Sequence, residues 1–263
     1  MNTAQLQQAV NQLLPAWHEH SRIEEITPAC RPHSRSQAYA LQQALFDACH
    51  EAPLGWKIAA TSKAGQQHIG VSGPLAGRLL QSRCLPEGQA ISLSRNAMAV
   101  AEAEFAFRIG RDVTRSSATP LSVGEVMDCV QALHIAIEIP DSRFMDFAKA
   151  GEAQLIADFA CACFVVLGRE VTQDWRSVDL AQHQVSVVQN GTHAAKGVGS
   201  NVLGDPRIAL AWLANELLDH GMHLKAGEIV MTGTCVVPVS LKIGDHLIAD
   251  FGTFGRVETR FIS

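Results

Sequence analysis

Short strand-like segments separated by turn residues dominate this chain from about residue 54 onward. Few helical segments lie between them, so the pattern predicts a mixed or antiparallel β-core and argues against a dinucleotide-binding parallel sheet. The signatures GxGxxG, GxxxxGK and GxSxG are absent as well. The predicted strands cover residues 54–60, 98–109, 133–139 and 159–168, with three short strands near 228–232, 246–251 and 256–262.

Two amphipathic helices precede these strands. Residues 3–19 gather their leucines and a valine on one face, and residues 36–50 form a second helix. We therefore expect an α+β protein, with a helical N-terminal segment over residues 1–53 and a β-rich domain over residues 54–263.

Local signals mark the remaining elements. Ser122 and Glu125 form a capping box that opens a helix. Asp205-Pro206 predicts the start of another helix, which ends at Gly221, because Asp caps a helix and Pro suits its first position. Asn190-Gly191 predicts a hairpin turn between two strands.

The composition excludes several classes of protein. The chain is 47% hydrophobic and 18% charged, which rules out intrinsic disorder, and its net charge of −5 argues against nucleic acid as a partner. The N-terminus has no signal-peptide pattern, and no apolar run approaches the ~20 residues of a membrane helix. Seven cysteines without a CxxC pair favour free thiols. We expect a cytoplasmic protein without a membrane partner.

Three carboxylates lie within apolar strand patterns. Side chains alternate along a strand, so Glu102 and Glu104 share one face with Ala106. Glu138 lies in the strand over 133–139, on the face opposite its three isoleucines. Each glutamate could simply face solvent on a half-buried strand. If they cluster in the interior, a cation must accompany them, and oxygen donors suit a hard divalent ion such as Mg²⁺ or Mn²⁺.

Lys57 is the basic residue that stands out in the same way. It lies in the apolar segment GWKIAA and shares a face with Gly55 and Ala59. An apolar setting would lower the pKa of its ammonium group, so that it could exchange protons near neutrality or pair with an anionic substrate. An exposed lysine with a buried stem is the simpler alternative.

Several segments together resemble the 2-keto-4-pentenoate hydratase (2-hydroxypentadienoate hydratase) family of the fumarylacetoacetate hydrolase-like superfamily. The segments that carry the resemblance are VAEAEFAFRIGRDV, AIEIPDSRF, GWKIAATSKAGQQHIGV and VLGDPRIALAWLANELLDHGMHLKAGEIVMTGT. The resemblance implies the mixed β-roll core of the fumarylacetoacetase C-terminal domain over residues 54–263. It also implies a homo-oligomer, a complex with a decarboxylase paralogue and a role in the meta-cleavage catabolism of aromatic compounds.

The resemblance also implies a site. Glu102, Glu104 and Glu138 fall on the family's ligands for Mg²⁺ or Mn²⁺, and Lys57 falls on the lysine near the substrate. The implied reaction adds water to a 2-hydroxy-2,4-dienoate of the 2-oxo-4-pentenoate type and gives a 4-hydroxy-2-oxo acid. A 4-oxalocrotonate-type decarboxylase and an acylpyruvate or fumarylacetoacetate-type C–C hydrolase remain alternatives, because these enzymes share the same ligands. A silent partner subunit, which keeps the fold with an altered and inactive pocket, is a further alternative.

Some residues depart from the family pattern, and they lie where the substrate is expected. The family's ADNAS is ADFAC here, at residues 157–161, and the tail reads TGT where hydratases often have TGS. Hydroxyl groups at strand ends and turns could hold a substrate carboxylate, although each could equally be a turn or cap residue. The candidate substrate-binding residues are Thr61, Ser62, Asp158, Thr232 and Thr234.

Overall fold

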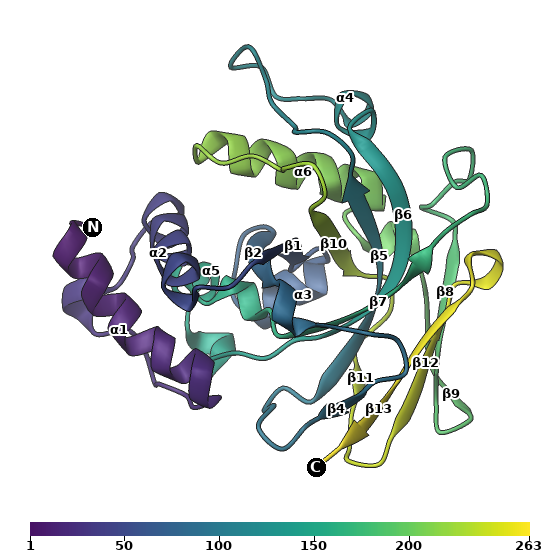
Figure 1. The fold of residues 1–263 in the computed structure, drawn as a ribbon, viewed down its shortest axis with the longest axis horizontal. Helices are drawn as coiled ribbons and strands as arrows, with labels where there is room; N and C mark the ends of the chain where they lie inside the picture. The colour runs from purple at the N-terminus through teal and green to yellow at the C-terminus, as the bar shows by residue number, and fades with distance from the viewer.

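The computed structural model describes residues 1–263 and confirms an α+β fold with two sheets (Figure 1). The helices are α1 (Thr3–Glu19), α2 (Arg35–Cys49), α3 (Lys63–His68), α4 (Val123–Met127), α5 (Glu152–Ala157) and α6 (Pro206–Asp219). The strands are β1 (Pro53–Ala59), β2 (Leu75–Leu80), β3 (Cys84–Leu85), β4 (Ala90–Ser92), β5 (Val100–Ile109), β6 (Val130–Ile139), β7 (Phe164–Glu170), β8 (Gln184–Gln189), β9 (Thr192–Val198), β10 (Ile229–Thr234), β11 (Val239–Ser240), β12 (His246–Asp250) and β13 (Arg256–Ile262).

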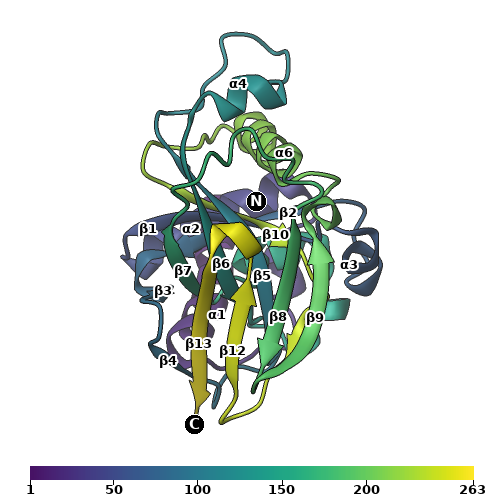
Figure 2. The same ribbon diagram turned by 90° about the vertical axis from the view of Figure 1, so that its right-hand side faces the viewer.

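The larger sheet has eight strands and is mixed, as the sequence predicts. Its order is β2-β1-β10-β5-β6-β7-β3, and β11 pairs with β5. Strands β1 and β10 run parallel, whereas β10, β5, β6 and β7 form an antiparallel series. The smaller sheet has the order β4-β13-β12-β8-β9, and β13, β12, β8 and β9 face the viewer in Figure 2. The four central strands of the larger sheet hold the residues of interest.

The two faces of the larger sheet pack against different layers. Phe105 points into a core shared with Val187 and Val257 of the smaller sheet. Ala106, on the opposite face of β5, belongs to a second core with Leu41 of α2. The N-terminal helices therefore cover the face of the sheet that carries Glu102 and Glu104, as the left side of Figure 1 shows. Because the second core joins helices and sheet, the division at residue 53 stays a prediction.

Most predicted elements agree with the structure, and the exceptions have local causes. Asn190 and Gly191 both have positive φ, as a hairpin turn of this type requires. The strand expected over 159–168 begins only at Phe164, because residues 159–161 form the left-handed turn η4 (Phe159–Cys161). The capped helix α4 is short, so β6 starts at Val130, earlier than predicted.

No helix in the structure has both the length and the apolar character that a membrane crossing needs.

Candidate active site

Three glutamates meet at the centre of the larger sheet. Glu102 and Glu104 lie on the same face of β5, and the pairing of β5 with β6 sets Glu138 directly opposite Glu102. One carboxylate oxygen from each side chain lies within 4.8 Å of the other two. Glu104 and Glu138 are fully buried, whereas Glu102 is partly exposed and lines a cavity. The alternation along β5 that the sequence predicts is therefore confirmed.

The oxygens of this cluster have few partners within the protein. The backbone N–H of Gly233 donates to Glu104 Oε2 at 2.8 Å, but Glu104 Oε1 and Glu138 Oε2 receive no hydrogen bond. Burial and the nearby glutamate charges raise the pKa of Glu104 well above its ordinary value. Burial and the charge of Glu138 raise the pKa of Glu102 to about 7. Buried, unpartnered carboxylates of this kind fit a hard divalent ion with oxygen ligands.

Lys57 reaches the same cluster from β1. Its Nζ lies 3.0 Å from Glu138 Oε1 in an ion pair and donates a hydrogen bond to the carbonyl of Ala160 at 3.1 Å. Burial alone would lower the pKa of the ammonium group, but the three neighbouring glutamates, led by Glu138, outweigh burial and raise it. The expected lowered pKa is therefore wrong for this arrangement, because strands far away in sequence supply the negative charge.

A left-handed turn holds the carbonyl that Lys57 contacts. Phe159, Ala160 and Cys161 all have positive φ (51°, 49° and 63°), an unusual run for residues other than glycine. The turn lies directly on the sheet at Gly77, where an added Cβ would come within 1.9 Å of the Phe159 carbonyl oxygen. Only glycine permits this close approach. Gly77 and the turn together fix one hydrogen-bond partner of Lys57.

Asp158 supports the same turn and does not line the cavity. It is fully buried, and its Oδ1 accepts a hydrogen bond from Arg143 Nε at 2.5 Å. Its Oδ2 accepts bonds from Ser142 Oγ and from the Arg143 backbone N–H, both at 2.8 Å. Every carboxylate oxygen is therefore occupied, so the structure does not bring Asp158 to the predicted substrate site. The sequence pattern carried no signal for the Arg143 pairing.

A cavity of about 710 Å³ opens beside Glu102 and Lys57. Thr61, Ser62 and Thr234 line it, as a substrate-binding role requires. The Thr234 hydroxyl donates to the Val236 carbonyl, and the Ser62 hydroxyl caps α3, so part of their hydrogen-bonding capacity is used locally. Thr232 is fully buried outside the cavity lining and donates to the carbonyl of Phe105.

Asn201 and Cys161 also line this cavity, and neither was a candidate from the sequence. Asn201 Nδ2 donates to the carbonyl of Cys235 at 2.7 Å, which holds the Asn201 side chain in place. Cys161 ends the left-handed turn, and burial raises the pKa of its thiol to about 12. The Cys161 side chain therefore meets a bound molecule as a neutral thiol. In the sequence, the only indication of a role for Cys161 is that it stands where the family's ADNAS segment has its serine.

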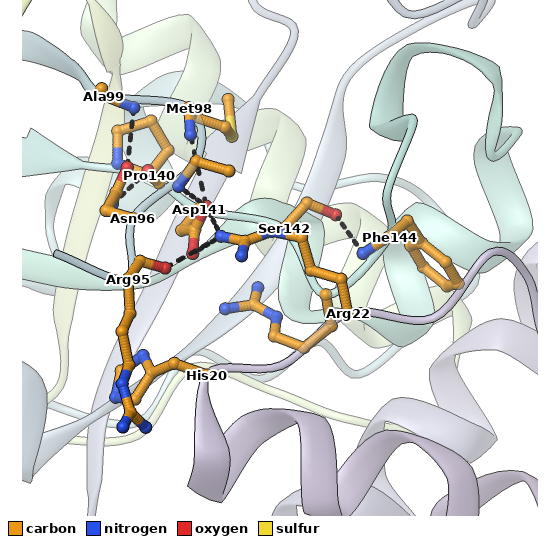
Figure 3. Close-up of polar contacts among 12 residues, drawn as sticks. His20, Arg22, Arg95, Asn96, Met98, Ala99, Pro140, Asp141, Ser142 and Phe144 are labelled. Atoms are coloured by element: carbon orange, nitrogen blue, oxygen red, sulfur yellow. Dashed lines mark hydrogen bonds and ion pairs between the residues drawn. The ribbon is translucent and has the colours of Figure 1, made fainter. Parts of the chain in front are cut away.

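The carboxylate of Asp141, buried just after β6, holds together the segments at one wall of the cavity. Its polar contacts are drawn in Figure 3. Asp141 accepts hydrogen bonds from Arg22 Nη2 at 2.8 and 3.0 Å and from the backbone N–H of Ala97 at 3.0 Å. The Asn96 side chain donates to the carbonyl that precedes Asp141. Because Ala97 and Met98 line the cavity, the link between Arg22 and Asp141 ties the N-terminal segment to the cavity wall.

We expect the substitution Arg22→Gln to lower the free energy of unfolding by about 1–3 kcal/mol, because it leaves the buried Asp141 carboxylate without its charged partner. The effect should fall toward the lower end, since the Arg22 side chain is 21% exposed. Urea denaturation measures the change. Arg256→Gln is the matched control: Arg256 pairs with Asp250 but is 70% exposed, so its effect should stay within about 0.5 kcal/mol. Equal effects of the two substitutions would contradict the anchoring role.

Comparison with known proteins shows the family of this chain. A sequence profile of the fumarylacetoacetate hydrolase C-terminal family matches residues 74–262. The chain is 31% identical to a 2-keto-4-pentenoate hydratase of Paraburkholderia phymatum, covering 95% of this chain and 94% of that protein. It is 34% identical to a 2-hydroxyhexa-2,4-dienoate hydratase of Comamonas testosteroni, covering 77% of this chain and 75% of that protein.

The fold also matches a solved structure along its full length. A 4-oxalocrotonate decarboxylase from Pseudomonas putida G7, complexed with magnesium and adipate, superposes with a TM-score of 0.90 at 26% sequence identity. The match covers 100% of this chain and 99% of that chain. On these grounds the chain is an enzyme of the lyase class that belongs to the fumarylacetoacetate hydrolase family, within its 2-keto-4-pentenoate hydratase group.

Proposed function

We propose that this enzyme adds water to a 2-hydroxy-2,4-dienoate and forms a 4-hydroxy-2-oxo acid, using Mg²⁺ or Mn²⁺ held by Glu102, Glu104 and Glu138. The observation that carries the proposal is the cluster of three glutamates, two of which have oxygens without a hydrogen bond, beside Lys57 and a cavity. The likeness to two hydratases supports the reaction. The magnesium in the decarboxylase structure supports a divalent ion.

The ion would act as a Lewis acid that favours negative charge on the C2 oxygen of the substrate. In the overall reaction, the 2-hydroxyl group loses its proton and C5 gains one, which moves the double bond to C3–C4. Water then adds its oxygen to C4 while C3 gains a proton. Lys57 is the cavity-lining group placed to hold and donate a proton, because Glu138 and the Ala160 carbonyl fix its ammonium beside the cluster.

Decarboxylation of a 4-oxalocrotonate-type acid is the second candidate. The observation that favours it is the full-length structural match to a 4-oxalocrotonate decarboxylase. That reaction stabilises the same enolate but breaks a C–C bond to release CO₂. The glutamates and Lys57 would serve both reactions, so the metal site alone does not separate them.

The separating experiment supplies 2-hydroxypenta-2,4-dienoate, 4-oxalocrotonate and an acylpyruvate in turn, each with Mg²⁺ and with EDTA. We expect Mg²⁺-dependent formation of 4-hydroxy-2-oxopentanoate from the first compound and no activity in EDTA. Release of CO₂ from 4-oxalocrotonate, without hydration of the first compound, would establish the decarboxylase instead. Cleavage of the acylpyruvate would indicate a hydrolase.

A further inference from the structure

The strands that carry the site residues continue past them into an apolar wall. Val100 lies two positions from Glu102 on the same face of β5, and Met98 precedes the strand. Ala59 stands in the same relation to Lys57 on β1. Val100, Met98 and Ala59 all line the cavity, so it extends away from the glutamates along the ends of these strands.

The rest of the outer wall is apolar as well. It comes from α3 and the loop after it, from the start of β2, from the turn η3 (Phe147–Lys149), from α5 and from the loop that follows β10. The residues that form it include Ile69, Leu75, Phe147, Leu155, Val237 and Pro238. Val237 is 77% exposed and therefore lies where the cavity opens to solvent. Apolar side chains therefore make up most of this part of the wall, with His68 as its charged or polar exception.

The cavity is larger than a five-carbon acid needs. Pockets of about 300–1,000 Å³ usually enclose drug-sized ligands, and this cavity has a volume of about 710 Å³. A 2-hydroxypentadienoate held at the glutamate end would leave most of the outer cavity unfilled. The remaining space is large enough to hold a longer substrate.

The outer cavity offers no fixed cation for a second carboxylate. No arginine lines the cavity, and Lys57 is already paired with Glu138. Besides Lys57, His68 is the one basic residue that lines the cavity. It is exposed, and its ring packs edge-on against Phe147 with centroids 5.8 Å apart. A carboxylate placed against these apolar side chains would lose hydration without gaining a partner.

We propose that the substrate carries an uncharged, apolar tail of several carbons beyond C5, and that this tail lies against Met98, Phe147, Leu155 and Val237. The proposal rests on the proposed function and names the substrate class of the same site. Each methylene of the tail that the cavity buries should strengthen binding about fourfold. A dicarboxylic acid of the same length should bind more weakly.

Binding of unreactive analogues tests the tail without requiring turnover. Straight-chain saturated 2-oxo acids from 2-oxopentanoate to 2-oxooctanoate are titrated into the Mg²⁺-loaded protein by calorimetry. We expect Kd to fall about fourfold for each added methylene, and 2-oxoadipate to bind at least about tenfold more weakly than 2-oxohexanoate. A Kd that does not depend on chain length, or tighter binding of 2-oxoadipate, would overturn the inference.

Turnover distinguishes failure of this inference from failure of the proposed function. If 2-hydroxypenta-2,4-dienoate is hydrated but longer tails neither raise kcat/KM nor lower Kd, the proposal of an apolar tail is wrong and the hydratase assignment stands. If Kd falls with chain length but no dienoate is hydrated, the tail is supported and the hydratase assignment is wrong. A higher kcat/KM for 4-oxalocrotonate than for every alkyl dienoate would contradict the proposal of an apolar tail.

A pair of matched variants locates the tail in the cavity. Val237→Asp adds a charge at the apolar opening, and we expect the ratio of Kd for 2-oxopentanoate to Kd for 2-oxooctanoate to fall at least about tenfold. Ile243→Asp is the control, because Ile243 is also an exposed β-branched residue (60%) but lies outside the cavity lining. An unchanged ratio in Val237→Asp, or an equal fall in Ile243→Asp, would contradict this location.

Discussion

The Glu104→Gln variant should lose Mg²⁺-dependent turnover by more than about 100-fold, because loss of a group outside the ligand shell already costs about 10–100-fold in metal affinity or activity. Glutamine keeps the shape of the side chain and can still accept the hydrogen bond from the Gly233 backbone N–H. It removes the charge that a divalent ion needs. Activity assays across a range of Mg²⁺ concentrations measure the loss of turnover. Calorimetric titration with Mg²⁺ alone measures the loss of metal affinity.

Without metal, we expect Glu104→Gln to be at least as stable as the native chain, although it loses activity. The oxygens of three carboxylates, two of them buried, lie within 4.8 Å of one another and repel, so removing one charge should leave the free energy of unfolding unchanged or raise it. Added Mg²⁺ should then stabilise the native chain but not the variant. Glu24→Gln, at an exposed position without side-chain partners, is the control and should behave as the native chain. Full Mg²⁺-dependent stabilisation in Glu104→Gln would contradict the metal site.

The second large effect concerns Lys57. In Lys57→Met we expect kcat to fall by about 10²–10⁴, the usual contribution of a positioned proton donor or acceptor. Affinity for Mg²⁺ should not fall, because the variant removes a positive charge 3.0 Å from Glu138. Steady-state kinetics and Mg²⁺ titration together distinguish loss of a proton-transfer group from loss of the metal site.

The control for Lys57 is a lysine outside the cavity lining. Lys63 is exposed at the start of α3 and has no acidic partner, so Lys63→Met should keep kcat within about threefold of the native value. Lys57→Met leaves the buried Glu138 without its ion-pair partner, which could destabilise the fold. Circular dichroism checks that the variant is folded. Native kcat in a folded Lys57→Met variant would remove Lys57 from the mechanism.

The alternation of side chains along single strands was visible in the sequence, but the meeting of strands was not. Period-two alternation places Glu102 and Glu104 on one face without knowledge of the fold. The register that sets Glu138 opposite Glu102 depends on the pairing of β5 with β6, which alternation alone does not fix. The family resemblance, rather than the pattern, joined these residues with Lys57.

Charge and hydrogen bonding within the site were the least accessible from sequence. The direction of the Lys57 pKa depends on three glutamates from two other strands, so local composition pointed the wrong way. Asp158 looked available for substrate, but its partner Arg143 lies 15 residues earlier and across a turn. The metal and substrate roles of the site residues stay predictions, as do the homo-oligomer and the complex with a decarboxylase paralogue.

The position of β10 in the larger sheet has a consequence for how the chain reaches its native state. β1 pairs only with β2 and β10, and β10 is also the strand that joins β1 to β5. Until residues 229–234 emerge from the ribosome, Lys57 and the glutamates belong to two separate sets of strands. Contacts so distant in sequence form slowly. The active site should therefore be among the last parts of the protein to assemble, and a chain that stops before β10 should never assemble it.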